Sequence, residues 1–168
     1  MFQRMENLFT EISEELLDLD VLMMSPHVYE QGLVKFIKNG GSHDVFTISD
    51  YLEIDDCPVK VEGMERLNRT MWNVCKRLAD HFGHDGPVTC HLFISPRDGV
   101  SFPMHTDLDD VVIYMVTGQK TFESLDGSMD LVAGDAIYIP RGTEHRAINT
   151  DSSLMLSFGL ELFTEAKL

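Results

Sequence analysis

The second half of the chain alternates short strand-like stretches with turns, and no other feature constrains the fold as much. Stretches rich in apolar and β-branched residues are separated by Gly, Pro, Asn and Asp, and they cover residues 88–94, 104–116, 120–124, 128–132, 136–139, 145–149 and 154–160. Asp126-Gly127 is typical of a hairpin turn. Short strands spaced by turns favour a jelly roll or barrel. We therefore predict a mainly β fold with a barrel core over residues 88–168.

The first 87 residues have a different pattern. Apolar residues recur at helical spacing over residues 6–19 and 63–82, which predicts two amphipathic helices. Residues 33–38 and 44–48 predict two strands joined through the turn Asn39-Gly40-Gly41. We expect this region, residues 1–87, to pack on the barrel, so that the 168 residues form one structural domain.

The chain is strongly acidic, with a formal net charge of -15 and a pI near 4.6. Such a surface repels phosphate backbones, so we do not expect a nucleic-acid partner. A basic protein or peptide, or a small cationic molecule, is a better match as substrate or partner.

The three cysteines, at positions 57, 75 and 90, are widely spaced and form no Cys-x-x-Cys pair. This pattern indicates neither a zinc knuckle nor a disulfide framework, and it fits a protein of the reducing cytoplasm. No apolar run reaches the length of a membrane span, and the N-terminus lacks the form of a signal peptide. We therefore expect a cytoplasmic protein with no membrane partner.

Three residues in the β-rich half form a candidate metal site: His105, Asp107 and His145. On a strand, residues two apart share a face, so His105 and Asp107 are expected to point toward the same place. His145 follows the tight turn Pro140-Arg-Gly142-Thr and can approach from another strand. Two histidines and one carboxylate leave about three positions of an octahedral shell open, which suits non-haem Fe(II) rather than a closed structural zinc site.

Two longer patterns contain these residues. The first is Gly99-x5-His105-x-Asp107-x3-Val111-x6-Gly118, and the second is Gly134-x5-Pro140-x-Gly142-x2-His145-x3-Asn149. Together they resemble the two motifs of the cupin superfamily, except that Val111 stands where many cupins carry a ligand Glu. The carboxylate at Asp107 instead resembles the Jumonji-C variant of the cupin site. Residues 90–96, 105–120 and 153–159 are similar to core strands of Jumonji-C oxygenases of the ribosomal-protein-hydroxylase branch.

This resemblance implies a double-stranded β-helix and an Fe(II)- and 2-oxoglutarate-dependent oxygenase that hydroxylates a protein side chain or a small metabolite. It implies that His105, Asp107 and His145 hold Fe(II), and that Lys120 binds the distal carboxylate of 2-oxoglutarate. A homodimer is also compatible with the family.

The sequence departs from the Jumonji-C pattern that it resembles at the hydroxyl that often accompanies the basic residue. Phe102 occupies the position of one such Thr, and Phe93 occupies a tyrosine-like position. A hydroxyl near Lys120 can come from several other residues, and the sequence does not choose among Ser95, Ser101, Thr121 and Tyr138.

Two other functions fit the same motifs. One is a metal-dependent cupin enzyme without 2-oxoglutarate, either a dioxygenase or an isomerase that uses its metal as a Lewis acid. The other is a non-catalytic cupin that binds a small molecule or another subunit. Binding of Fe(II), followed by a visible charge-transfer band on addition of 2-oxoglutarate, separates the three.

Overall fold

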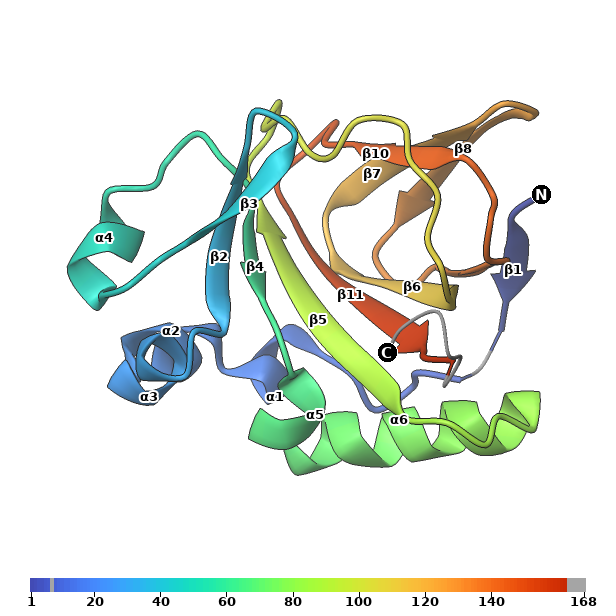
Figure 1. The fold of residues 1–168 in the computed structure, drawn as a ribbon, viewed down its shortest axis with the longest axis horizontal. Helices are drawn as coiled ribbons and strands as arrows, with labels where there is room; N and C mark the ends of the chain where they lie inside the picture. The colour runs from blue at the N-terminus through green and yellow to red at the C-terminus, as the bar shows by residue number, and fades with distance from the viewer. Residues whose placement is uncertain (7, 163–168) are drawn as a thin grey trace.

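The computed structural model describes residues 1–6 and 8–162, in which two antiparallel sheets form a jelly roll (Figure 1). The larger sheet has the strand order β1 (Gln3–Met5), β9 (Ala136–Ile139), β6 (Asp110–Thr117), β11 (Ser153–Leu160), β5 (Val88–Ser95), β4 (Val59–Val61), β2 (Val34–Lys38) and β3 (Gly41–Asp44). The smaller sheet has the order β10 (His145–Ile148), β7 (Gln119–Ser124) and β8 (Gly127–Val132). The predicted mainly β, double-stranded β-helix architecture is confirmed.

The two faces of the larger sheet bury two separate cores. Alternate residues such as Leu92, Val112 and Leu156 pack against the N-terminal segment and the helices. Residues of the other parity, including Ile113 and Met155, face the smaller sheet and pack with apolar residues from it. This division follows from the two-residue period of a strand, and it leaves the inner face of the sheet free to line a site between the sheets.

The helices cover the outer face of the larger sheet (Figure 1). They are α1 (Glu14–Leu17), α2 (Leu19–Met24), α3 (Pro26–Glu30), α4 (Ile48–Leu52), α5 (Met64–Leu67) and α6 (Arg69–Phe82). Within the part of the chain that the structure describes, no helix is long and apolar enough to cross a membrane.

Both predicted helices differ from the observed ones. The helix predicted over residues 6–19 is wrong for most of its length, because Phe9 lies in an irregular segment and stacks on Tyr114 and Phe158. In the described part of this range, the short helix α1 forms, capped by the Ser13 side chain, and α2 begins at Leu19. The helix predicted over residues 63–82 is divided at Asn68, whose side chain accepts hydrogen bonds from the first backbone N–H groups of α6. A polar side chain that caps a new helix interrupts an otherwise continuous apolar pattern.

Most strands in the second half lie within one or two residues of their predicted bounds. The long strand predicted over residues 104–116 is an exception, because β6 begins only at Asp110. The hairpin in the first half is present, but β3 spans Gly41–Asp44 rather than residues 44–48. Strands β1 and β4 were not predicted, since three residues are too few to show a period.

Gly118 connects β6 to β7 at a point of close backbone approach. Its φ is +76°, and a Cβ there would overlap the carbonyl oxygen of Ser152. We expect Gly118→Ala to lower the free energy of unfolding by about 3 kcal/mol, because backbone strain adds to a clash with main chain that cannot move aside. Urea denaturation measures this loss. Gly134→Ala is the control, since Gly134 also has a positive φ but open space around it, and its loss is expected to be about 1 kcal/mol.

Candidate metal centre

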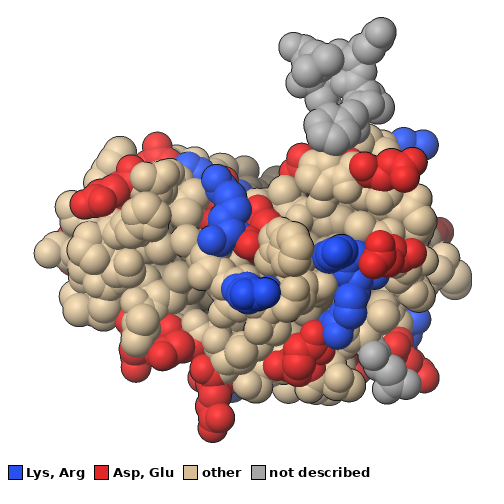
Figure 2. Space-filling model, turned by 90° about the horizontal axis from the view of Figure 1, so that it is seen from below, with Lys and Arg blue, Asp and Glu red and all other residues tan. Residues whose placement is uncertain are grey.

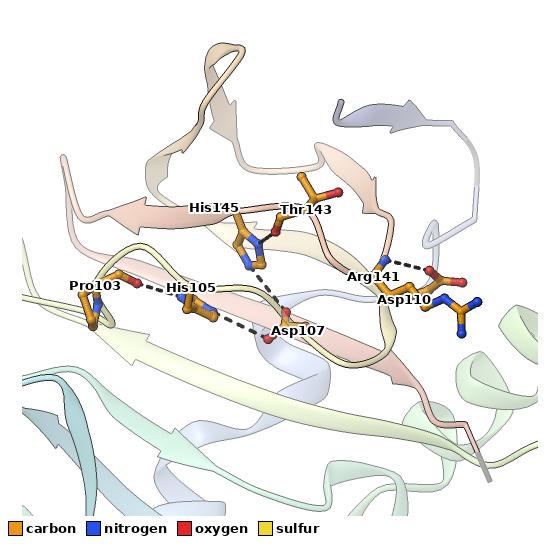
Figure 3. Close-up of polar contacts among 7 residues, drawn as sticks. All are labelled: Pro103, His105, Asp107, Asp110, Arg141, Thr143 and His145. Carbon is orange, nitrogen blue, oxygen red and sulfur yellow. Dashed lines mark hydrogen bonds and ion pairs between the residues drawn. The ribbon is translucent and has the colours of Figure 1, made fainter. Parts of the chain in front are cut away.

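His105, Asp107 and His145 come together at one end of the space between the sheets (Figure 3). His145 is the first residue of β10, and His105 lies in the loop between β5 and β6. The backbones of the two histidines form an isolated antiparallel bridge, with N–H to O=C distances of 3.0 and 2.9 Å. This bridge fixes the two imidazoles side by side, with ring centroids 4.5 Å apart.

The route by which Asp107 reaches the cluster differs from the predicted one. Residues 106–109 are not a strand, so strand alternation does not align Asp107 with His105. Instead, the Asp107 carbonyl accepts a hydrogen bond of 3.0 Å from the N–H of Gly142. The Asp110 carboxylate also accepts from the N–H of Arg141, at 2.8 Å (Figure 3). The turn before His145 therefore holds the loop that carries Asp107.

The donor atoms of the three side chains are close enough to share one ion. The Nε2 of His105 is 3.6 Å from Oδ1 of Asp107, and the Nε2 of His145 is 3.5 Å from Oδ2 of the same carboxylate. All candidate donor atoms lie within 4.8 Å of one another. The His145 side chain is only 7% exposed, whereas those of His105 and Asp107 are 36% exposed. The cluster is therefore open on one side.

Backbone carbonyls determine the tautomers of both histidines. The Nδ1 of His105 is 2.8 Å from the carbonyl oxygen of Pro103, and the Nδ1 of His145 is 2.9 Å from that of Thr143. A carbonyl can only accept a hydrogen bond, so each Nδ1 carries the proton and each Nε2 presents a lone pair to the cluster. Metal-ligating histidines usually have this arrangement.

A cavity of about 490 Å³ extends from the three side chains into the space between the sheets. Its inner part is lined by Lys120 together with the apolar residues Phe93, Ile113, Phe122 and Met155. Two residues of β6, Val111 and Ile113, line this cavity, whereas Met115 of the same strand is fully buried in the core between the sheets.

Lys120 is buried at the inner end of the cavity, where the side chain is only 1% exposed. Its Nζ donates a hydrogen bond of 2.9 Å to Oγ of Ser95 and lies 5.9 Å from the centre of the Phe93 ring. Among the residues described, no carboxylate forms an ion pair with it. Burial without a counter-ion lowers the pKa of Lys120 to about 7.

Ser95 is the predicted hydroxyl candidate that contacts Lys120. The hydroxyl of Thr121 pairs with Asp130, and Ser101 accepts from the Asn149 amide. Tyr138 stacks on Phe82 on the outer side of the sheet. Phe102 offers no hydroxyl and packs edge-on against the His105 ring, with centroids 5.9 Å apart.

Asn149 is a supporting residue whose role the sequence did not reveal. Its amide nitrogen donates to the carbonyl of Gly99 and, at 3.0 Å, to the hydroxyl of Ser101. These bonds tie the end of β10 to the loop that leads to His105. The only signal in the sequence was its place at the end of the second motif.

Comparison with known proteins agrees with this geometry. Residues 91–161 match the model of the cupin domain. Two curated relatives are bifunctional lysine-specific demethylase and histidyl-hydroxylase NO66 proteins. The one from Branchiostoma floridae is 24% identical over 122 residues, or 71% of this chain and 20% of the relative. The one from Dictyostelium discoideum is 24% identical over 120 residues, or 56% of this chain and 23% of the relative.

The structure is also similar to that of YcfD, a ribosomal oxygenase from Escherichia coli. The TM-score is 0.67 at 16% identity, over 99% of this chain and 49% of that one. A YcfD structure in complex with cobalt and 2-oxoglutarate gives a TM-score of 0.66 at 17% identity, over 99% of this chain and 50% of that one. The chain thus spans about half of YcfD and about a fifth of the curated relatives. The predicted resemblance to cupin oxygenases is confirmed, and it establishes the fold.

Proposed function

We propose that this chain is an Fe(II)- and 2-oxoglutarate-dependent oxygenase that hydroxylates a C–H bond of its substrate. The observation that carries the proposal is one cavity with a His-Asp-His cluster at one end and a buried, uncompensated lysine at the other. The His-Asp-His cluster fits a metal ion with open coordination positions. The buried lysine fits the distal carboxylate of a keto diacid such as 2-oxoglutarate.

The residues present fit Fe(II). His105 and His145 would each offer Nε2, and Asp107 would offer a carboxylate oxygen. Two imidazoles and one carboxylate form the set that non-haem Fe(II) oxygenases use. Bound Fe(II) with a keto acid would supply O2 activation and C–H oxidation, which no side chain in the cavity can perform.

The inner cavity fits 2-oxoglutarate. A dicarboxylate would bring a negative charge to the Lys120 ammonium, which forms no ion pair with a carboxylate of residues 1–6 and 8–162, and the Ser95 hydroxyl would stand beside it. Apolar side chains around the middle of the cavity would exclude water from the keto-acid chain. The backbone-bonded Nδ1 atoms would keep both imidazoles in one orientation as co-substrate enters and leaves.

A side chain of a basic protein is the substrate that we favour over a small metabolite. The printed names of the relatives describe a lysine-specific demethylase and histidyl-hydroxylase and a ribosomal oxygenase. The net charge of -15 would attract a basic protein. Figure 2 shows that, on the face seen from below, Lys and Arg form small groups beside Asp and Glu. The outer part of the cavity is polar, lined by Lys60, Thr89, His91, Asp109 and Glu161.

Anaerobic titration of the purified protein tests the proposal. Fe(II) is added first and 2-oxoglutarate second, and succinate is measured after O2 is admitted. We expect one equivalent of Fe(II) to bind, a weak visible charge-transfer band to form with 2-oxoglutarate, and slow succinate release without substrate. Tight Fe(II) binding with no response to 2-oxoglutarate would instead favour a cupin enzyme that does not use this co-substrate.

The pKa of Lys120 predicts how 2-oxoglutarate affinity depends on pH. The carboxylate binds the charged ammonium, and the free protein loses that charge as pH rises through about 7. Binding above this pH must therefore take up a proton, and we expect Kd to rise roughly tenfold per pH unit from about pH 7.5. Titrations of the charge-transfer band between pH 6.5 and 8.5 measure this slope. A Kd that stays flat over this range would show that the ammonium charge does not contribute.

A further inference from the structure

A second buried serine lies beside the one that contacts Lys120. Ser153 of β11 stands directly opposite Ser95 of β5 in the antiparallel register, and the two residues are 5% and 3% exposed. Side chains of directly opposite residues lie on the same face of a sheet, with Cβ atoms roughly 4.5–5.5 Å apart. The two side chains therefore lie side by side on one face of the larger sheet, where Ser95 contacts Lys120 of the cavity lining.

The face that Ser153 occupies is the one that lines the cavity. Met155 and Ser157, the next residues of the same parity on β11, both line it. Since alternate residues of a strand share a face, Ser153 points to the same side as these two. It thus lies on the side of the sheet from which Ser95 accepts the hydrogen bond of Lys120.

The hydroxyl of Ser153 has no hydrogen-bond partner among residues 1–6 and 8–162, although its oxygen is buried. A buried hydroxyl without a partner costs about 1–3 kcal/mol, so such groups usually meet a ligand or an ordered water. The Lys120 ammonium has three N–H donors, and within the same described part of the chain its side-chain hydrogen bond goes to Ser95. The Ser153 hydroxyl and the remaining N–H donors of Lys120 thus lack a side-chain acceptor among the described residues, and both groups neighbour Ser95.

We propose that Ser153 is a third ligand of the distal carboxylate of the co-substrate, and that its hydroxyl donates a hydrogen bond to a carboxylate oxygen. Lys120 supplies the charge, and Ser95 and Ser153 flank it from neighbouring strands. This inference rests on the proposed use of 2-oxoglutarate. It also accounts for Phe93, whose ring faces the ammonium but offers no hydroxyl. Ser95 of β5 and Ser153 of β11 supply the hydroxyl groups that this tyrosine-like position lacks.

The test compares two keto acids in the anaerobic Fe(II)-loaded protein. 2-Oxoglutarate has the distal carboxylate, and 2-oxobutanoate has the same keto-acid head without it. We expect Ser153→Ala to weaken 2-oxoglutarate binding about tenfold, because a hydrogen bond to a charged group is lost, and to leave 2-oxobutanoate affinity within about twofold. The charge-transfer band reports both affinities. Ser153→Cys keeps a similar volume but donates weakly, and the same selective loss is expected.

Ser152→Ala is the matched control, since the neighbouring side chain is exposed on the opposite face of the chain, and both affinities should stay at wild-type values. Unchanged 2-oxoglutarate affinity in Ser153→Ala would overturn the assignment. Equal losses for both keto acids would also overturn it, because they would indicate a structural effect on the whole cavity. A wild-type protein that forms no band with 2-oxoglutarate would instead reject the proposed function, and this inference with it.

Discussion

Asp107→Ala is expected to abolish Fe(II) binding and turnover. The carboxylate lies 3.6 and 3.5 Å from the two histidine Nε2 atoms and is the only acidic member of the cluster found among the described residues. Without it, two neutral imidazoles would have to hold a divalent ion, and we expect the affinity for Fe(II) to fall at least about 100-fold. Calorimetric titration with Fe(II) under anaerobic conditions measures this loss, and His105→Ala should behave in the same way.

Glu144→Ala provides the control for this experiment. Glu144 is the neighbour of His145, but its side chain is exposed and it is not a member of the cluster. Its removal should leave Fe(II) affinity within about twofold, as expected for a surface carboxylate. If Glu144→Ala removed the metal and Asp107→Ala retained it, the assignment of the metal ligands would be wrong.

Lys120→Met is expected to stabilise the protein while removing its affinity for 2-oxoglutarate. The folded protein holds the pKa of Lys120 at about 7, below the ordinary value of 10.5, because the ammonium is buried. Between about pH 7 and pH 10.5, the unfolded chain therefore holds a proton on Lys120 that the folded protein lacks. The cost of burying the charged ammonium lowers the free energy of unfolding most at and below pH 7. Replacing a buried charge by an apolar side chain of similar length should raise the free energy of unfolding by about 2 kcal/mol at pH 7.

This gain should diminish as pH rises toward 10.5, because the unfolded chain then loses the same proton. Thermal melts of the apoprotein at pH 7 and pH 9.5 measure the trend. The same variant should bind 2-oxoglutarate at least about 100-fold more weakly while it still binds Fe(II). Lys76→Met, at an exposed lysine of α6, should change neither property. A Lys120→Met protein that is less stable than wild type at pH 7 would show that Lys120 contributes to the fold rather than to ligand binding.

The strands around the cavity could be predicted because each carries its own signal. Residues 136–139 were predicted with the bounds of β9, since an apolar stretch there lies between the turn at Gly134 and Pro140. The N-terminal segment could not be predicted in this way. Its apolar residues have helical spacing, yet Phe9 lies in an irregular segment and stacks on Tyr114 and Phe158. Tertiary packing overrides weak local preference in such cases.

The sequence by itself determined which side chains are available to a metal, because His105, Asp107 and His145 stand in two motifs whose turns are local. Only the tertiary structure decided how they meet. The carbonyl of Asp107 is held by Gly142, and His105 bridges to His145, through hydrogen bonds between segments far apart in the chain. The burial of Lys120 and the position of Ser95 opposite Ser153 likewise depend on strand register. Burial and long-range hydrogen bonds are properties of the folded chain, and no local pattern of residues encodes them.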